Sequence, residues 1–200
     1  MKHGTPGSGR SSRARNGVVM SEFEGGVGRV PDIMWLQKLI IERAIVRGNY
    51  TTAGGHKTDY YIDKFRLFSD PTILRRIARM FAPSVAEVSP DLIAGTEIGG
   101  VILATAVSQM AGLPMIVVRK QPKAYGAFAN EYVEGDFSEG QRVLLLEDIV
   151  TSARDLMISK ARLEEMGLEV EMRAMVNRGL APVKALLQFT LPSGTPRTDN

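Results

Sequence analysis

The feature that most constrains the fold is a regular alternation of short apolar runs with helix-periodic segments. The apolar runs occupy residues 92–94, 115–118, 143–146 and 170–176. The run 143–146 is apolar throughout rather than alternating, which is typical of a strand buried on both faces of a sheet. Strands that alternate with helices predict a parallel sheet with right-handed crossovers, so the predicted fold class is α/β.

Two helices are predicted before the first of these strands. Apolar side chains at 33–44 recur at helical spacing, and Gly48 is expected to end the run. Asp70 can cap a second helix, and Pro71 suits its first turn. Between the two helices, the aromatic and aliphatic residues 60–62 predict a short strand or hairpin.

The two ends of the chain differ in composition from the rest. Residues 1–29 are rich in glycine, serine and arginine and lack apolar periodicity, which predicts a disordered arm. Residues 191–200 are similarly polar and predict a loose tail. We therefore expect one domain over residues 30–190, a length that can bury a sizeable core.

Composition excludes several classes of function. The 200 residues contain no cysteine and two histidines, which excludes disulfides, thiolate chemistry and a histidine-rich metal site. No apolar run approaches the roughly 20 residues of a membrane span, and no secretory signal is recognisable, so the cytoplasm is the expected compartment. The net charge of +3 favours an anionic ligand, but no docking motif accompanies it, so nucleic acid is not an expected partner.

An acidic pair follows the most apolar of the predicted strands. Residues 143–146 lead directly into Glu147 and Asp148, and small hydroxyl residues precede the next helix. In open parallel sheets, ligands bind beyond the carboxyl ends of the strands. Two carboxylates there are costly to crowd unless they bind sugar hydroxyls, a cation or a developing positive charge. Hydroxyls and amides at the following helix start predict a phosphate site.

A basic loop follows the predicted strand 115–118. It opens with Arg119, Lys120 and Lys123, three cations within five positions, and runs to about residue 135. Ordered loops of this length are usually functional. Three clustered cations can neutralise a pyrophosphate, so we expect this loop to bind a polyanion.

These motifs resemble those of the type I phosphoribosyltransferases, and in particular the orotate phosphoribosyltransferase family. The acidic strand end with Thr151 and Ser152 is similar to the family's thirteen-residue signature. The basic loop is similar to the Arg-Lys-x-x-Lys-x-His-Gly loop that distinguishes orotate enzymes from purine enzymes. The segment 95–100 resembles the family's pyrophosphate loop. The resemblance implies a parallel sheet flanked by helices and a small N-terminal hood, mainly at residues 30–68.

The resemblance also implies a reaction, in which ribose 5-phosphate passes from phosphoribosyl pyrophosphate (PRPP) to orotate. The products are orotidine 5'-monophosphate, on the route to UMP, and pyrophosphate. The implied PRPP-binding residues are Arg119, Lys120, Lys123, Tyr125, Glu147, Asp148, Thr151, Ser152, Ala153, Arg154 and Asp155. The implied orotate-binding residues are Thr151, Arg178 and Tyr61. The implied catalytic residues are Lys123, Lys120 and Asp148.

The resemblance further implies a cofactor and a partner. Mg²⁺ would enter on the pyrophosphate group of PRPP, and no direct protein ligand is assigned to it. The family's loop closes over the neighbouring subunit, which implies a homodimer in which residues 119–135 reach the partner's site.

Two alternatives to the orotate reaction stay open from the sequence. Ala53 and Tyr125 stand where the family has lysine and histidine, which motivates a phosphoribosyltransferase with another base as acceptor. Ala153 and Arg154 replace glycine in the phosphate loop, and the N-terminal arm is basic. These features motivate a non-catalytic regulator that binds PRPP or a nucleotide.

Overall fold

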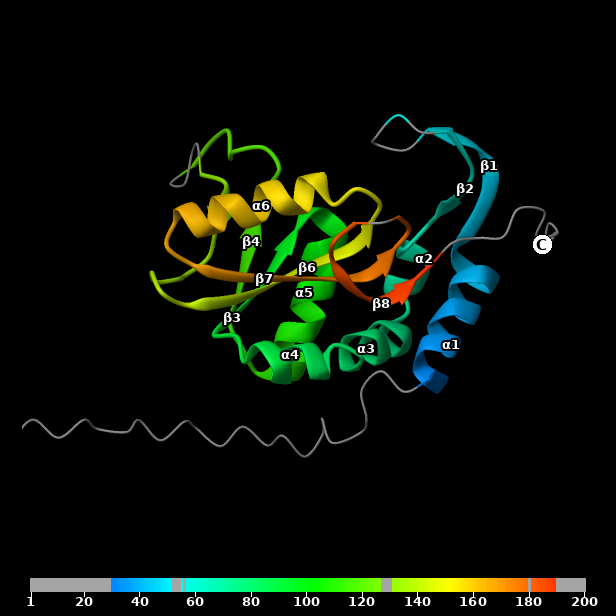
Figure 1. Ribbon diagram of the computed structural model, residues 1–200, viewed down its shortest axis with the longest axis horizontal. Coiled ribbons are helices and arrows are strands. Elements are labelled where there is room, and N and C mark those ends of the chain that lie inside the picture. The colour runs from blue at the N-terminus through cyan, green and yellow to red at the C-terminus, as the bar shows by residue number, and fades with distance from the viewer. Residues whose placement is uncertain (1–29, 52–54, 56, 127–130, 180, 190–200) are drawn as a thin grey trace, which may run out of the picture.

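The computed structural model describes residues 30–51, 55, 57–126, 131–179 and 181–189. They form a six-stranded sheet with helices on both faces and a separate two-stranded sheet at one side (Figure 1). The predicted arm at 1–29, the tail at 191–200 and Ala53 lie outside these residues, so those predictions are untested. No helix in the described part of the chain is long and apolar enough to cross a membrane.

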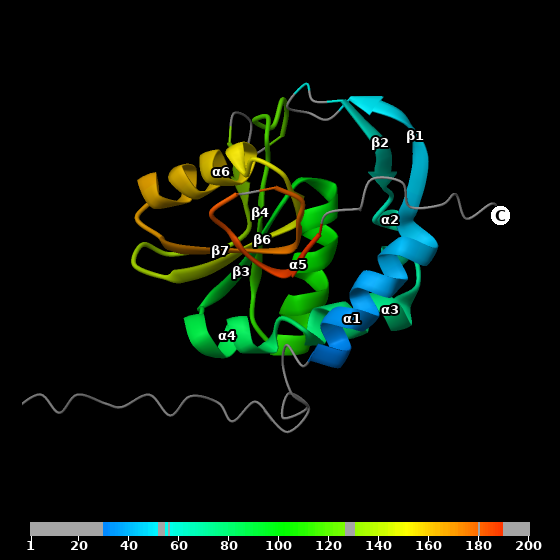
Figure 2. The same ribbon diagram turned by 45° about the vertical axis from the view of Figure 1, so that its right-hand side comes forward.

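The two-stranded sheet belongs to the N-terminal segment, which carries the predicted hood. Its elements are α1 (Val30–Leu39), the π-helical turn η2 (Ile40–Ala44), β1 (Ile45–Thr51), β2 (Lys57–Ile62) and α2 (Phe65–Phe68). Strands β1 and β2 pair antiparallel, as the hairpin expectation required. The helical run ends at Ala44, and Gly48 lies within β1, so the prediction that Gly48 ends the helix was wrong. Figure 2 shows this unit standing beside the main body.

Helix α3 (Pro71–Arg79) confirms the predicted capped start. The Asp70 side chain accepts hydrogen bonds from the backbone N–H groups of Thr72 and Ile73, and Pro71 occupies the first turn. A short helix, α4 (Ala82–Val88), follows and leads to the main sheet. The two helices lie along one side of that sheet in Figure 1.

The main sheet has the strand order β5-β4-β3-β6-β7-β8. Its elements are β3 (Leu92–Thr96), α5 (Glu97–Ala111), β4 (Met115–Val118), β5 (Val133–Glu134), β6 (Arg142–Val150), α6 (Arg154–Glu165), β7 (Glu169–Asn177) and β8 (Lys184–Gln188). The four predicted strands are present and parallel. The structure adds two edge strands that the sequence analysis did not predict, the antiparallel β5 and the parallel β8.

Both faces of the sheet are buried, which explains the apolar run in β6. Leu144 and Leu146 pack into a cluster with α3 and α5, whereas Val143 and Leu145 face the cluster beneath α6. Neighbouring side chains of a strand point to opposite faces, so a strand covered on both sides needs apolar residues at every position.

The strand register places the acidic pair at an open edge. Residues 92–95 of β3 pair with 143–146 of β6, and β3 then turns into α5. Strand β6 runs on to Val150, paired with β7 alone. Glu147 and Asp148 therefore lie beside the start of α5, where no neighbouring strand covers them on that side.

Candidate active site

The Asp148 carboxylate is buried and held by a lysine from the N-terminal segment. Its side chain is 6% exposed, and its Oδ2 lies 3.2 Å from Nζ of Lys64, which follows β2. Burial lowers the pKa of Lys64, but the charge and hydrogen bond of Asp148 outweigh it and raise that pKa overall. The ammonium therefore stays charged near neutral pH and offsets the cost of burying the carboxylate.

The Glu147 carboxyl, next to Asp148, has a strongly raised pKa. Burial raises the pKa of Glu147 to about 9, and the negative charge of Asp148 adds to the shift. Glu147 Oε1 also accepts a hydrogen bond of 3.0 Å from the Asp148 N–H. Near neutral pH the Glu147 carboxyl thus keeps its proton, which removes the repulsion that two adjacent charged acids would produce.

Two glycines in the first turn of α5 make room for this pair. A Cβ at Gly99 would lie 2.7 Å from Asp148 Cγ, and one at Gly100 would lie 2.8 Å from the Leu146 carbonyl oxygen. Real Cβ atoms essentially never approach other heavy atoms closer than 3.0 Å. The glycines of segment 95–100 therefore serve a close approach between α5 and the end of β6, at the position of the predicted pyrophosphate loop.

The predicted phosphate turn joins β6 to α6. Thr151 and Ser152 are exposed there, and Ala153 adopts a left-handed conformation with φ of 58° at the N-cap of α6. That conformation is one that glycine adopts at little cost. Ala153 thus keeps the backbone of a glycine turn despite its methyl group. Gly179 packs so closely on the Thr151 carbonyl that a Cβ there would collide with it.

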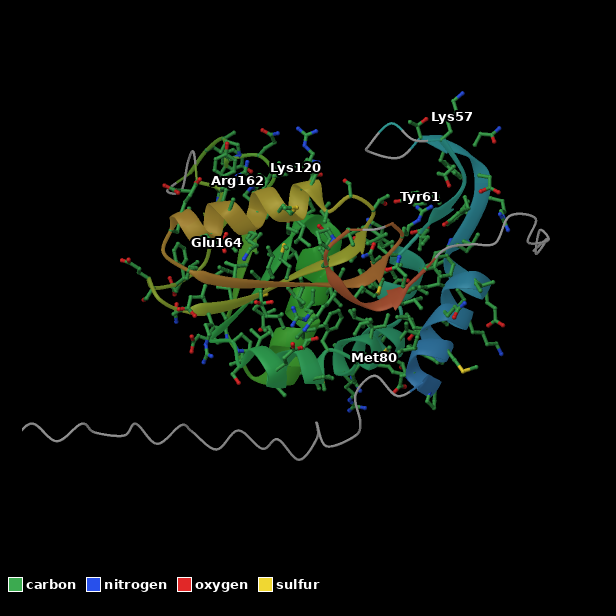
Figure 3. All side chains as sticks on the ribbon, viewed as in Figure 1. Lys57, Tyr61, Met80, Lys120, Arg162 and Glu164 are labelled. Carbon is green, nitrogen blue, oxygen red and sulfur yellow. The ribbon has the colours of Figure 1, made fainter. Side chains whose placement is uncertain are left out.

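The basic loop reaches the same edge of the sheet. Lys120 Nζ lies 2.7 Å from Oδ2 of Asp155 in the first turn of α6, and the hydrogen bond to Asp155 raises the pKa of Lys120. The Lys120 N–H also donates to Glu97 Oε1. Figure 3 shows Lys120 close to α6, the helix that carries Arg162. Asp155, an unexpected residue beside a phosphate site, is therefore neutralised by a loop lysine.

The other two loop cations share one carboxylate. Lys123 Nζ lies 2.6 Å and Arg119 Nη1 3.0 Å from the two oxygens of Glu134 in β5. The hydrogen bond from Lys123 lowers the pKa of Glu134 most strongly. Tyr125 is 78% exposed. In this conformation Arg119, Lys120 and Lys123 are all paired with protein carboxylates.

The predicted orotate-binding residues lie between β7 and the hood. The Arg178 guanidinium is 4.2 Å from the centre of the Tyr60 ring, and its Nη2 is 3.5 Å from the hydroxyl of Thr58. Its Nε is buried and has no hydrogen-bond partner among the described residues. Tyr61, labelled in Figure 3, is 44% exposed, and its ring centre lies 5.9 Å from that of Tyr50, with the two ring planes tilted by 50°. Arg178 thus has one N–H donor, at Nε, that no described residue beside the hood accepts.

Sequence reasoning missed three residues of this site. Lys64 is far in the sequence from Asp148, its ion-pair partner, whereas Glu134 lies near the end of the basic loop whose cations it binds. Asn177 is buried and holds the segment after β7, because its Nδ2 donates to the Ala181 carbonyl and its Oδ1 accepts from Gly179 N–H. The signal for Asn177 was its place before Arg178, but neither lysine nor glutamate stood in a recognisable motif.

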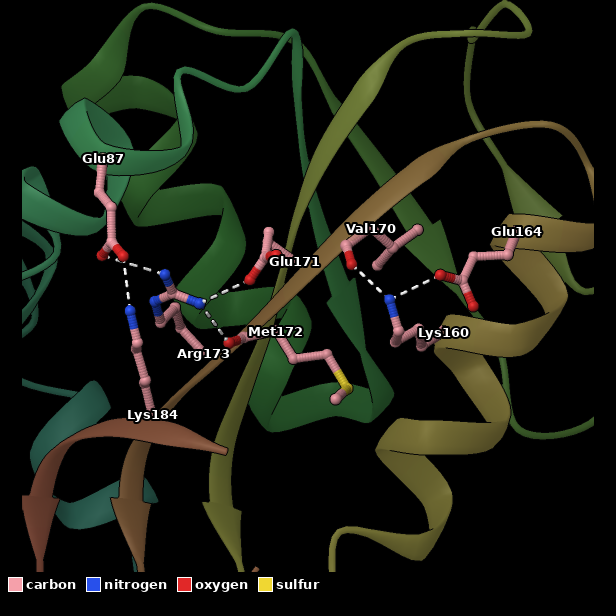
Figure 4. A network of polar contacts seen from close by, with 8 residues as sticks. All are labelled: Glu87, Lys160, Glu164, Val170, Glu171, Met172, Arg173 and Lys184. Carbon is pink, nitrogen blue, oxygen red and sulfur yellow. Dashed lines mark hydrogen bonds and ion pairs between the residues drawn. The ribbon is translucent and has the colours of Figure 1, made fainter. Parts of the chain in front are cut away.

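A second polar cluster lies at the opposite edge of the sheet, where β6, β7 and β8 begin. The buried Arg173 pairs with Glu87 and Glu171, and Lys184 also pairs with Glu87 (Figure 4). These cations and carboxylates satisfy one another. The cluster therefore ties α4 to the sheet and stands apart from the acidic pair.

Comparisons with known proteins find orotate phosphoribosyltransferases among both sequences and solved structures. The chain is 36% identical over 143 residues to the orotate phosphoribosyltransferase of Thermococcus gammatolerans, a match covering 70% of this chain and 75% of the relative. It is 37% identical over 137 residues to that of Methanothermobacter thermautotrophicus, covering 68% and 74%. A solved orotate phosphoribosyltransferase of Mycobacterium tuberculosis in complex with PRPP matches with a TM-score of 0.62 and 25% identity, covering 78% of this chain and 96% of that one. No protein-family model matches the chain.

Proposed function

This chain belongs to the orotate phosphoribosyltransferase family, and we propose on that basis that it transfers ribose 5-phosphate from PRPP to orotate. The products are orotidine 5'-monophosphate and pyrophosphate, which makes the chain a pentosyl-transferring enzyme of pyrimidine biosynthesis. Two relatives named orotate phosphoribosyltransferase are 36% and 37% identical to the chain over most of its length. We propose the cytoplasm as its compartment.

The observation that carries this proposal is the acidic pair at the end of β6, flanked by the phosphate turn and the basic loop. The Asp148 carboxylate is built into the edge of the sheet, and Lys120 reaches the first turn of α6. A ribose bound by Glu147 and Asp148 would place its 5-phosphate at Thr151 and Ser152. The pyrophosphate group would then face the cations of the loop.

In the proposed reaction, the bond from ribose C1 to the pyrophosphate oxygen breaks as a bond from C1 to a ring nitrogen of orotate forms. The electron pair of the breaking bond leaves with pyrophosphate, and the proton of the ring nitrogen passes to pyrophosphate or to solvent. Positive charge develops on the ribose and negative charge on the leaving group. Asp148 favours the first and the cations of the loop favour the second, which is preorganised electrostatic stabilisation.

The resting contacts of the loop support a closing step. Lys120, Lys123 and Arg119 are paired with Asp155 and Glu134 at the edge of the site. Pyrophosphate carries more negative charge than either carboxylate, so its arrival would draw the cations inward. Closure would exclude water and protect PRPP from hydrolysis.

The base is proposed to bind between Arg178 and the hood. The Nε of Arg178, which has no hydrogen-bond partner among the described residues, and the planar guanidinium suit a two-pronged contact with the carboxylate of orotate. Thr58 and Tyr60 of β2 contact Arg178 directly, and Tyr61, which follows Tyr60 in that strand, points to its other face. A competition assay with other bases tests this acceptor, because an alternative acceptor would be consumed in preference to orotate.

We propose Mg²⁺ as the cofactor, entering with PRPP. Among the described residues, no group of three or more histidine or acidic side chains could hold a metal ion. The acidic pair offers one carboxylate already engaged by Lys64 and one protonated carboxyl. Such a donor set fits Mg²⁺ only when pyrophosphate oxygens and waters supply most of its ligands, as this ion prefers.

A homodimer is also proposed, in which the loop 119–135 reaches the partner's site. An apolar groove lies beside this loop, lined by Ile98, Val101, Ile102 and Val117, and Ile98 is 69% exposed. Such a surface suits a second copy of the chain. Mixing Lys123→Ala with Asp148→Asn subunits tests this arrangement: activity well above that of either variant alone supports it, and no recovery contradicts it.

The decisive test of the reaction follows orotate absorbance with purified protein, PRPP and Mg²⁺. We expect loss of absorbance that needs both substrates and that collapses in Lys123→Ala. Lys184→Ala, which removes a lysine from the opposite edge of the sheet, is the matched control and should keep its activity. Absence of turnover together with PRPP binding by calorimetry would favour a regulator instead.

A further inference from the structure

Lys64 links the N-terminal segment to the acidic pair. Its backbone is fixed between β2 and α2, because the Asp63 N–H donates to the Ala44 carbonyl and the Lys64 N–H donates to the Ile62 carbonyl. Its side chain then crosses to the end of β6, where Nζ lies 3.2 Å from Asp148 Oδ2. An element of the hood thus determines the surroundings of a carboxylate in the main sheet.

The path of this side chain is enclosed. The Lys64 side chain is 21% exposed, and its ammonium lies 5.2 Å from the centre of the Phe65 ring. A Cβ at Gly99 would lie 3.2 Å from Lys64 Cε, so the glycine leaves the space through which the lysine passes. An enclosed ammonium loses little further freedom when it pairs with Asp148.

Removal of the ammonium would leave the buried carboxylate without its partner charge. Buried carboxylates that lose a partner turn towards water or take up a proton. Either response would change the atoms that Asp148 presents to a ribose. Glu147 does not replace the lysine, because its protonated carboxyl carries no positive charge.

We propose that Lys64 is a positioning residue for the PRPP site: it holds the Asp148 carboxylate in the orientation that receives the ribose hydroxyls. The role rests on the proposed function. Lys64 acts through Asp148 and does not itself contact the pyrophosphate group, which faces the loop cations. Loss of Lys64 should therefore weaken the binding of PRPP and spare that of free pyrophosphate.

The test measures PRPP and pyrophosphate binding by calorimetry for wild type, Lys64→Met, Lys64→Arg and Lys38→Met. We expect Lys64→Met to lose on the order of 10-fold to 100-fold in PRPP affinity, the size of effect of a lost hydrogen bond to a charged group, with pyrophosphate affinity unchanged. Lys64→Arg should restore most of the affinity. Lys38 is an exposed lysine of α1, so Lys38→Met should resemble wild type.

A double-mutant cycle with Asp148→Asn separates a positioning role from a general loss of structure. If Lys64 acts through Asp148, the double variant should bind PRPP no worse than Asp148→Asn alone. Additive losses, equal losses for pyrophosphate, or unchanged PRPP affinity in Lys64→Met would each overturn this role. A wild-type protein that binds no PRPP would instead overturn the proposed function, and this role with it.

Discussion

Gly99 leaves the space that the Asp148 carboxylate occupies, and its replacement by alanine tests the geometry of the site. Glycine to alanine in a helix usually stabilises a protein by about 0.5–1 kcal/mol. Here the added Cβ would lie 2.7 Å from Asp148 Cγ, and carbon atoms in contact are about 3.5–4.0 Å apart. Asp148 Oδ2 would lie closer still, so the carboxylate must move by at least about 1 Å, away from the position that Lys64 holds.

A displacement of this size predicts a large loss of activity. Misplacement of a reacting group by about 1 Å can cost about 100-fold in rate, equal to about 2.7 kcal/mol of transition-state stabilisation. We expect Gly99→Ala to lower kcat/KM for PRPP by this order, measured as loss of orotate absorbance over a range of PRPP concentrations. Circular dichroism should show an intact fold, because the movement concerns one side chain.

The matched control is Gly140→Ala, which places the same methyl group in open space at a position with φ of 80°. Alanine in a left-handed conformation costs roughly 1 kcal/mol of stability, so this variant should melt earlier but keep its kcat/KM. If Gly99→Ala kept wild-type kcat/KM, the carboxylate would have free space elsewhere, and its position would not matter for the reaction.

Three further predictions follow from the charges of the site. Glu134→Gln should lower the KM for PRPP by roughly twofold to fivefold, because it releases loop cations from a half-buried carboxylate. A higher KM in steady-state assays would mean that Glu134 orients Lys123 productively. Because the pKa of Glu147 is raised to about 9, the folded state binds a proton that the unfolded chain releases above about 4.5, so stability should fall as pH rises between these values. Glu147→Gln should flatten that slope in thermal melts, and a steeper slope would contradict the shift. Arg178→Ala should raise the KM for orotate about 10-fold to 100-fold and leave PRPP affinity unchanged in calorimetry; equal losses for both would place Arg178 outside the base site.

The main sheet was predictable from the sequence because its signals are local. The continuous apolar run 143–146 indicates by itself a strand buried on both faces. Asp70 and Pro71 likewise indicate the start of a helix, because the cap forms with residues no more than three positions away. Strand β8 was missed because it is short and polar at both ends. Its extended conformation depends on pairing with β7, which no pattern within Lys184–Gln188 announces.

The candidate site was likewise predictable from the sequence only in part. The acidic pair, the phosphate turn and the basic loop were recognisable, because each is a contiguous motif. Their partners were not: Lys120 pairs with Asp155, 35 residues away, and the contact depends on the loop meeting the start of α6. The left-handed backbone of Ala153 was equally hidden, because only the folded turn shows that alanine adopts a conformation that glycine favours.

The sequence by itself determined the parallel α/β sheet and the edge at which a ligand would bind, since apolar periodicity and strand direction are set by neighbouring residues. Only the tertiary structure decided how the acidic pair is charged. Lys64 belongs to the hood, and its meeting with Asp148 depends on how the hood packs against the start of α5. Burial and ion pairing are properties of that packing, so they arise only when distant segments come together.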